Sequence, residues 1–475
     1  MNNQLSIFDI IYPKFKIDKS IRLIELFAGY GSQALALKYL GVPFEHWKIC
    51  EWAIKSIQAY KDIHFTNNTD YSKTLNKEQL QEFLFNKGIS SNYNEPMNRE
   101  QINRLNENNL RTIYNNIVTT HNMVNIQQVK GEDLEIVDTD KYCYIMCYSF
   151  PCQDLSLAGK GKGMSDTSTR SGMLWEVERI LTECKELGQL PSVLLMENVP
   201  QVHGEGNVED FNKWQLRLEE LGYKNYWEDL IATDYGIPQT RNRCFMVSIL
   251  GDYSYSFPPK KSLKLRLKNM LEDNVDEKYY LSDKQIQDIQ NWNAYEKPLE
   301  TINNENSKTL TTRIGAYCSG MQLVKDTFKI KNATKKGYLE ATDGDGIDIS
   351  SRMEHHRGTV QKGKAQTITT QCDNGVVIGT YQYSKSDNFM NGKDRLQLGK
   401  ETSDTLQTTP KEAIVNSNLR IRKLTPKECW RLMGFDDKDF EKASKVNSNT
   451  QLYKQAGNSI VVNVLVAILN NLLME

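Results

Sequence analysis

One cysteine, Cys152, is placed where a chain could do chemistry on a bound substrate. The run from Tyr142 to Phe150 is apolar and rich in β-forming residues, which predicts a buried parallel strand. The strand should end at Pro151, because proline fixes φ and cannot donate to a ladder. Cys152 is therefore predicted just past the carboxyl end of a strand, where open α/β sheets bind ligands. A free cysteine is more often a core residue, so a chemical role depends on the residues around it.

A glycine-rich, cationic segment follows this cysteine, from Gly159 to Gly163. It alternates glycine with Lys160 and Lys162. Such a segment could close over a phosphate-bearing substrate. We expect it to act as a lid that places both ammonium groups on phosphates.

A second site is predicted near the N-terminus. Residues 21–27 predict a strand, and Ala28-Gly-Tyr-Gly-Ser32 a tight turn into a helix. A G-x-G turn lets backbone N–H groups approach a ligand closely. Glu51 ends the next strand about twenty residues later, where doubly wound folds place an acid on a ribose hydroxyl, and Trp52 could stack on a base. The combination predicts a nucleoside-bearing cofactor, although such a turn alone can serve packing.

Two further apolar segments carry polar side chains near their ends. Residues 192–199 predict a strand ending in Glu197, and a buried carboxylate is costly unless it has a partner or a task. Before another apolar run, Gln239, Arg241 and Arg243 alternate along an extended segment, which sends them to one face. A surface strand would show the same alternation.

The composition limits the class of protein. A chain of 475 residues should split into two or more domains. A net charge of -1 restricts any nucleic-acid surface to a local patch. The 9 cysteines contain no C-x-x-C pair, and the adjacent pair His355-His356 reads as solvated, so we expect a reducing compartment and no metal site. Without a signal peptide, and with Ile460–Leu473 too short to span a bilayer, the chain is expected to be cytoplasmic, without membrane contact.

Strands that alternate with helices predict an α/β fold, a doubly wound Rossmann-like sheet, over residues 1–250. Residues 63–130 are polar and Asn-rich and read as a helical insertion. The final segment, 448–475, ends in an apolar helix that should be buried and return to the first sheet.

Residues 251–447 have a different texture, rich in threonine, glycine and asparagine. Their β-prone, turn-bounded segments predict small antiparallel hairpins. Hydroxyls and amides suit contacts with base edges and phosphates, and a generic β-rich accessory domain is the alternative. A weak repeat recurs at Lys308–Thr312, Gln366–Thr370 and Asp404–Thr408.

Taken in order, these motifs resemble those of the DNA (cytosine-5)-methyltransferases of bacteria and phages. Phe27-Ala-Gly-Tyr-Gly31 is similar to the family's cofactor turn and Phe150-Pro-Cys-Gln153 to its catalytic motif. Glu197-Asn-Val199 is similar to the pyrimidine-binding motif and Gln239-x-Arg241-x-Arg243 to the paired-arginine motif. The insertion is longer than a minimal member needs, and three Thr-Leu-like pairs leave open which one is the family's usual pair.

The resemblance implies a methyltransferase that uses S-adenosylmethionine, with a smaller target recognition domain before Leu424. It implies catalytic roles for Cys152, Glu197, Arg241 and Arg243. The implied cofactor contacts are Phe27, Ala28, Gly29, Gly31, Glu51, Trp52, Asp133, Leu134, Pro151, Leu174, Asn458 and Ser459. The expected DNA contacts are Gln153, Lys160, Lys162 and Gln239.

The chemistry of these residues agrees with the resemblance. C5 of cytosine becomes nucleophilic when a thiolate, here Cys152, adds to C6, and a thiol with a pKa near ~8.5 needs activation nearby. Glu197 would hydrogen-bond the N3 and amino edge, while Arg241 and Arg243 would hold the base oxygen and sugar-phosphate. C5 then attacks the methyl group of S-adenosylmethionine. The cytosine must be flipped out of the duplex to be reached.

The resemblance further implies duplex DNA as partner, a monomer, and a restriction-modification setting in which an endonuclease acts without direct contact. The target sequence cannot be read from one chain. The alternatives are a catalytically silent DNA-binding module, transfer to RNA as in the tRNA-directed branch, exocyclic-amine methylation and dehydrogenase chemistry. No Asp/Asn/Ser-Pro-Pro-aromatic loop supports the third, and nothing suggests a hydride acceptor for the fourth.

Overall fold

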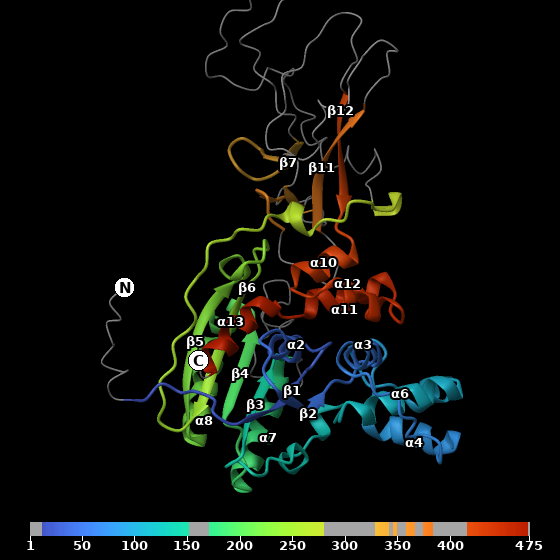
Figure 1. Ribbon diagram of the computed structural model, residues 1–475, viewed down its shortest axis with the longest axis vertical. Coiled ribbons are helices and arrows are strands. Elements are labelled where there is room, and N and C mark those ends of the chain that lie inside the picture. Colours follow the sequence, from blue (N-terminus) through green and yellow to red (C-terminus); the bar gives the residue numbers. More distant parts are fainter. Residues whose placement is uncertain are drawn as a thin grey trace, which may run out of the picture. The chain divides into compact units, whose positions relative to one another are not determined.

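The computed structural model describes residues 12–151, 171–279, 328–341, 345–348, 358–365, 374–382 and 416–473. The chain forms two compact units (Figure 1). The larger contains the residues up to Leu265 and those from Pro426 onward, and the smaller lies between Arg266 and Thr425. The helices after Pro426 therefore belong to the unit that carries the N-terminal sheet.

The larger unit is built on a six-stranded sheet with the order β2-β1-β3-β4-β6-β5. The first four of these positions are parallel, and β6 is antiparallel to both β4 and β5. The predicted doubly wound α/β fold is confirmed. The strands are β1 (Ser20–Leu26), β2 (Phe44–Cys50), β3 (Tyr142–Tyr148), β4 (Val193–Asn198), β5 (Tyr223–Ile231) and β6 (Asn242–Leu250).

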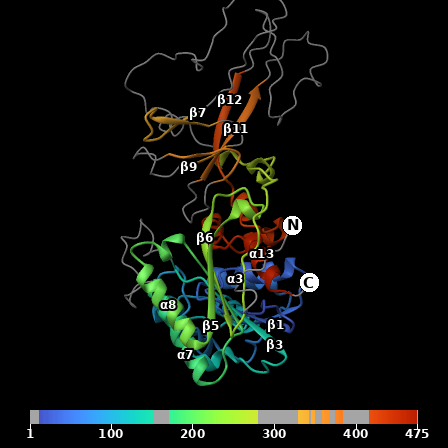
Figure 2. The ribbon, with the colours of Figure 1, turned by 90° about the vertical axis from the view of Figure 1, so that its left-hand side faces the viewer.

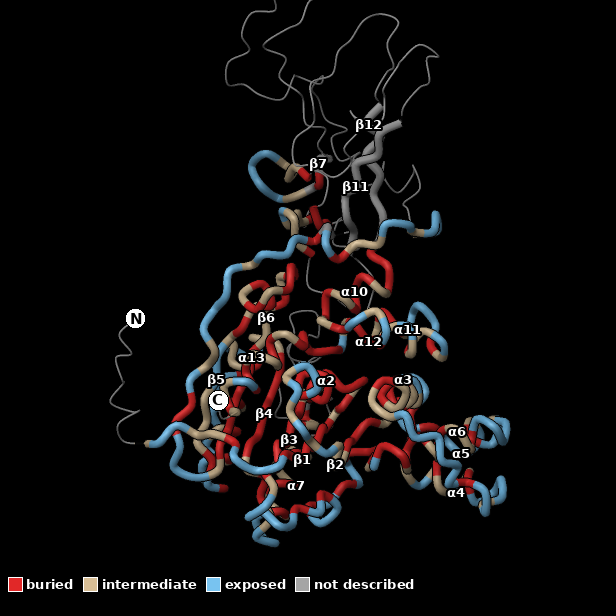
Figure 3. Tube along the Cα trace, viewed as in Figure 1, coloured by how far each residue is buried: buried red, intermediate tan, exposed pale blue. Residues whose placement is uncertain are grey.

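Helices cover both faces of this sheet (Figure 2). α7 (Leu174–Glu186) and α8 (Val208–Leu221) pack on one face, where Ile24, Met146 and Trp214 share a core. On the other face α2 (Ser32–Tyr39) contacts α13 (Val462–Leu472). The inner strands β1, β3, β4 and β6 are mostly buried between the two helical layers (Figure 3), which explains the continuous apolar run of β3.

The insertion forms a small helical layer with its own core, shared with α3 (Ile54–His64). Its helices are α4 (Lys77–Lys87), α5 (Arg99–Asn103) and α6 (Glu107–Thr119). The abundance of asparagine has a structural cause here, because Asn76, Asn98 and Asn106 each cap a helix by accepting a backbone N–H bond.

The C-terminal segment forms α10 (Pro426–Leu432), α11 (Asp437–Ser444), α12 (Asn449–Asn458) and α13. It meets the start of the chain, since Ile17 N–H donates to Leu472 O at 2.7 Å. By length and composition the stretch Asn449–Leu472 could cross a membrane, but 67% of its most apolar window is buried inside the protein. The chain also breaks between α12 and α13, so these are two core helices.

The smaller unit is antiparallel throughout its described strands. One sheet has the order β10-β9-β11-β12, and β7 pairs with β8. Its β-rich character was predicted, but all three Thr-containing repeats and His355-His356 lie outside the described residues. The strands are β7 (Phe328–Lys331), β8 (Tyr338–Ala341), β9 (Gly346–Asp348), β10 (Val360–Gln361), β11 (Asn374–Gln382) and β12 (Asn416–Lys423).

Short 3-10 helices connect several of these elements. They are η1 (Ile126–Gln128), η2 (Gly131–Leu134), η4 (Ser171–Met173), η5 (Pro200–His203), η6 (Ala232–Tyr235), η7 (Leu267–Met270) and η8 (Glu277–Tyr279).

Candidate active site

Three parallel strands end at the same edge of the sheet. Leu26 of β1 lies beside Tyr148 of β3, and Tyr148 lies beside Met196 of β4. The glycine turn, the segment that leads to Pro151, and Glu197 therefore all start from this edge. Ligands of open α/β sheets bind at such a position, where the direction of strand winding reverses.

The turn after β1 has an unusual backbone. Phe27, Gly29 and Gly31 all have positive φ, at 59°, 57° and 87°. A Cβ on Gly31 would overlap the rings of His64 and Tyr60, so only glycine fits there. A Cβ on Gly29 would meet nothing within 4 Å, which leaves open space for a ligand against the backbone. Phe27 adopts the left-handed conformation despite its side chain, which costs free energy.

Glu51 joins the end of β2 to this turn. Its Oε2 accepts from the Gly29 N–H at 3.0 Å, and its Oε1 accepts from the Ala53 N–H at 2.7 Å. Burial raises the pKa of Glu51 to about 7, and the backbone hydrogen bonds oppose this rise. The neighbouring Trp52 is half-buried and packs against the core of the insertion. Glu51 therefore lies against the glycine turn, at the end of β2.

A second buried acid, Glu25, was missed by sequence reasoning. It is fully buried on β1, where its carboxylate accepts from the Tyr60 hydroxyl and from the Ala34 N–H, the latter at 3.3 Å. Burial raises its pKa to about 7. His64 Nε2 lies 2.9 Å from Tyr30 O, under the same turn. An acid between the apolar residues Ile24 and Leu26 of a predicted strand was the signal available in the sequence.

The two ends of the chain meet beside the turn. Ser32 Oγ and Ser459 Oγ are 2.7 Å apart and buried. Arg241 is 4% exposed and donates to Ser459 O at 2.7 Å and to Gly457 O at 3.3 Å. Tyr30 stacks on Trp430 with ring centroids 4.4 Å apart. The turn therefore contacts Ser459, a predicted cofactor residue that lies 427 positions from Ser32 in the chain.

Glu197 and Arg243 form a buried ion pair at the end of β4. Arg243 Nε lies 3.2 Å from Glu197 Oε1. Burial raises the pKa of Glu197, and the positive charges of Arg243 and Arg241 oppose this rise. A carboxyl group with a raised pKa can hold a proton that it shares with a bound ligand.

Asn198, next to Glu197, ties β4 to the end of β3. Its Nδ2 donates to the Phe150 carbonyl at 3.0 Å, and this bond is buried. The backbone that leads into Pro151 is therefore held beside Glu197. Cys152, Gln153, Lys160 and Lys162 lie outside the described residues.

Gln239 does not fit the predicted DNA contact. It is 0% exposed, and its Nε2 donates to Leu432 O at 2.7 Å. Gln239 alternates with Arg241 and Arg243 along the chain, but its side chain points into the protein. We therefore assign Gln239 to holding the C-terminal end of α10.

Three other predicted cofactor residues are not presented as free side chains. Leu134 and Leu174 are fully buried in the core beneath α7, and the Leu134 carbonyl accepts from Trp47 Nε1 at 2.8 Å. Asp133 accepts from the Lys130 N–H at 2.8 Å and lines an open groove of about 750 Å³ beside Trp47. None of the residues that line this groove belongs to the glycine turn or to Glu51-Trp52.

Comparison with known proteins identifies the family. The family profile for C-5 cytosine-specific DNA methylase matches residues 99–474. The chain belongs to this family. The methylase is therefore an enzyme that methylates C5 of cytosine in DNA. The sheet edge where β1, β3 and β4 end is its candidate active site and is called the catalytic edge below.

Two curated relatives and one solved structure show the extent of the similarity. The methylase is 32% identical to the type II methyltransferase M2.ScrFI of Lactococcus lactis subsp. cremoris, over 95% of this chain and 99% of that protein. It is 37% identical to the orphan methyltransferase M.SssI of Spiroplasma monobiae, over 56% of this chain and 68% of that protein. The Entamoeba histolytica methyltransferase EhMeth shares the fold, with a TM-score of 0.50, 14% identity, and coverage of 96% and 98%.

Proposed function

We propose that this methylase transfers a methyl group from S-adenosylmethionine to C5 of a flipped-out cytosine in a specific duplex sequence. The reaction would pass through a covalent bond between Cys152 and C6 of the base. The observation that carries this proposal is the bond from Asn198 to Phe150 O beside the Glu197–Arg243 ion pair. This hydrogen bond supports the proposal that Cys152, two residues after Phe150, acts as the nucleophile on a base held by Glu197.

The turn after β1 fits a nucleoside-bearing cofactor. The backbone beside Gly29 is open, and the carboxylate of Glu51 lies against the same residue. Glu51 would accept from ribose hydroxyls, Trp52 would stack on the adenine, and the turn from Phe27 to Gly31 would approach the amino-acid end. When bound, S-adenosylmethionine supplies an electrophilic methyl group. Further proposed contacts are Ala28, Asp133, Leu134, Pro151, Leu174, Asn458 and Ser459.

The reaction proposed for Cys152 has two steps. The thiolate would form an Sγ–C6 bond and electron density would move to C5, which would then take the methyl group from the sulfonium of S-adenosylmethionine. Loss of the C5 proton to a base then restores the C5=C6 double bond and expels the thiolate. The thiol must be activated for the first step, because an ordinary cysteine has little thiolate at neutral pH.

Glu197 and the two arginines would serve the base. Glu197, whose pKa is raised by burial, would share a proton with N3 and so stabilise the charge that develops as C6 is attacked. Arg243 would keep that carboxyl in place and contact the base oxygen or the sugar-phosphate. Arg241 would be held in place by its bonds to the backbone carbonyls of Gly457 and Ser459. These bonds would link the residues proposed to hold the base to those proposed to bind the cofactor.

The smaller unit and the segment after Cys152 would engage the DNA. We propose that the β-rich unit between Arg266 and Thr425 reads the target sequence, within the predicted recognition region 251–447. Lys160 and Lys162 would contact phosphates as a lid closes, and Gln153 would contact the DNA near the flipped base. Replacing both lysines by alanine should weaken DNA binding and reduce its dependence on salt. An unchanged salt slope would reject the lid.

The relatives suggest a biological setting. One is a type II methyltransferase and another an orphan, so we propose a cytoplasmic monomer that protects DNA, with any cognate endonuclease acting separately. Transfer of labelled methyl groups to plasmid DNA and to tRNA, assayed side by side, tests the substrate. Bisulfite sequencing of DNA from cells that express the chain would give the target sequence.

The covalent step has its own test. Cys152→Ser should lower turnover by at least roughly 10³-fold, because an alcohol is a far weaker nucleophile than a thiolate. S-adenosylmethionine should still bind with near-normal affinity. DNA that contains 5-fluorocytosine should trap a covalent adduct with the native chain and not with the variant. Turnover at the native rate in the serine variant would overturn the assignment.

A further inference from the structure

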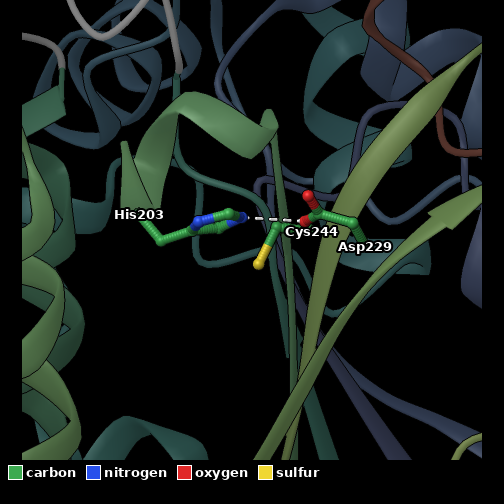
Figure 4. Close-up of side chains that lie close together, drawn as sticks. All are labelled: His203, Asp229 and Cys244. Atoms are coloured by element: carbon green, nitrogen blue, oxygen red, sulfur yellow. Dashed lines mark hydrogen bonds and ion pairs between the residues drawn. The ribbon is translucent and has the colours of Figure 1, made fainter. Parts of the chain in front are cut away.

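A group of three metal-binding side chains lies outside the site described above (Figure 4). Cys244 of β6 is paired with Asp229 of β5, and both are joined by His203 from the end of η5. Residues paired directly across antiparallel strands share a face of the sheet. Cys244 is also paired with Asn198, so this face is the one opposite to Glu197, because neighbouring residues on a strand point to opposite faces.

The ligand atoms are close enough to share one ion. They all lie within 4.8 Å of one another, and His203 Nε2 is 2.9 Å from Asp229 Oδ1. Ligand atoms around a tetrahedral zinc ion stand about 3.5 Å apart, given metal–ligand bonds of roughly 2.0–2.3 Å. The widest separation therefore needs to close by at most about 1.3 Å to reach zinc geometry.

The surroundings suit a metal with a single open position. Cys244 is 0% exposed, whereas the side chains of His203 and Asp229 are 24% and 31% exposed. Solvent thus reaches His203 and Asp229, which gives an ion an entry path. The indole of Trp227 packs on the imidazole of His203, with ring centroids 4.7 Å apart, and restricts its orientation.

We propose that His203 Nε2, the Asp229 carboxylate and Cys244 Sγ bind one zinc ion, with water as the fourth ligand. The donor set of imidazole, carboxylate and thiolate matches zinc and excludes magnesium and calcium, which prefer oxygen ligands only. On binding, the thiol loses its proton to solvent and the S–metal bond forms. The ion, one thiolate, one carboxylate and a neutral imidazole then sum to zero charge, which suits a half-buried position.

Such an ion would stabilise the backbone behind the catalytic edge. It would join η5, which directly follows Glu197-Asn198-Val199, to β5 and β6. Asn198 lies in the same row as Cys244 and holds Phe150 O. The zinc site would therefore act as a structural clamp on the strand ends, and no step of methyl transfer passes through it.

The experiment uses the full-length chain, stripped of metal with a chelator, without DNA or cofactor. Cobalt(II) is titrated as a spectroscopic substitute and zinc is measured by calorimetry. We expect one equivalent of cobalt with a thiolate-to-metal charge-transfer band, and a rise in the melting temperature with zinc. Cys244→Ser should remove the band, and His203→Gln and Asp229→Asn should each weaken binding by at least about tenfold.

The matched control is Cys184→Ser, which replaces another buried thiol whose hydrogen bond to Gly131 O a serine can keep. This variant, and Cys152→Ser, should bind cobalt with the native band. His203→Gln and Asp229→Asn change half-exposed side chains, so they test the site even if Cys244→Ser fails to fold. No stoichiometric cobalt or zinc binding at micromolar metal, or native binding in the His203 and Asp229 variants, would overturn the proposal and leave only a hydrogen-bonded brace.

Discussion

The two halves of the catalytic edge hold their buried carboxylates in different ways. On the side proposed to bind the cofactor, Glu25 and Glu51 accept from backbone N–H groups and, for Glu25, from a tyrosine hydroxyl. On the side proposed to hold the base, Glu197 faces the guanidinium of Arg243 at 3.2 Å. Burial raises the pKa of all three acids, but only for Glu197 do positive charges oppose the rise.

This difference indicates two roles for the acids: Glu25 and Glu51 position the backbone, and Glu197 takes part in the proposed chemistry. An acid held by backbone donors fixes the path of the chain, so Glu25 and Glu51 set the shape of the turn around Gly29 and Gly31. An acid held by a guanidinium can exchange protons and charge with a ligand while its partner keeps it in place. We therefore expect changes on the cofactor side to alter affinity and changes on the base side to alter turnover.

The largest expected effect lies on the base side. Glu197→Gln should lower kcat by roughly 10²–10⁴-fold, because the amide cannot share a proton with N3. The dissociation constant of S-adenosylmethionine should stay within about twofold of native. The matched change Glu51→Gln should reverse this pattern, raising that dissociation constant about tenfold with kcat at saturation little changed. If both variants lose turnover and affinity together, the two halves are not separable.

The turn itself offers the next largest effect. Gly31→Ala should destabilise the fold by about 3 kcal/mol, since φ is 87° and the new Cβ would overlap His64 and Tyr60. Gly29→Ala is the matched control, because its φ is also positive but its Cβ meets no protein atom within 4 Å. It should cost about 1 kcal/mol in stability and weaken cofactor binding instead. Denaturant titration and calorimetry measure the two effects, and equal losses of stability would contradict the open space at Gly29.

Substitutions of Arg241 and Arg243 test the same difference between the two halves of the catalytic edge. Arg241→Lys should weaken S-adenosylmethionine binding by about tenfold, because one ammonium cannot reproduce the bonds to Gly457 O and Ser459 O. Arg243→Lys should leave that affinity near native and move the pH profile of kcat, since it alters the charge beside Glu197. A pH profile that moves with Arg241→Lys and not with Arg243→Lys would reverse the assignment.

The smallest expected effect is a dependence of the unfolding free energy on pH, which arises from Glu25. Burial raises the pKa of Glu25 to about 7 from an ordinary value of 4.5, so the folded state keeps a proton that the unfolded chain loses. The associated stability is fully present below about pH 4.5 and is lost as the pH rises through about 7. Glu25→Gln should remove this pH-dependent contribution, on the order of 1 kcal/mol between pH 6 and 8. An identical pH slope of the unfolding free energy in native and variant proteins would contradict it.

Glu25→Gln is a fair test because the amide can keep both contacts. Its oxygen can accept from the Ala34 N–H, and its NH₂ can donate to the Tyr60 hydroxyl. That hydroxyl can in turn donate to His46 Nδ1, which lies 3.0 Å away. Burial lowers the pKa of His46 to about 4, so its ring is neutral over the measured range.

The strands that position the site were readable because both of their faces are buried. β3 is a continuous apolar run, β1 and β4 are mostly apolar, and each of the three ends near a residue that could do chemistry. β5 was not predicted, since Tyr223–Ile231 lies at the edge of the sheet with Trp227 and Glu228 among its exposed or half-exposed residues. Such a strand carries no apolar run by which to recognise it.

The sequence by itself determined the order of the motifs, the α/β class and the identity of the chemical groups. Only the tertiary structure decided what those groups contact. Arg241 and Arg243 look equivalent in an alternating pattern, yet one bonds Ser459 O, 218 positions away, and the other pairs with Glu197. His203, Asp229 and Cys244 show no metal spacing and meet only because η5, β5 and β6 are neighbours. Side-chain partners distant in the chain follow from strand order and register, which local periodicity does not encode.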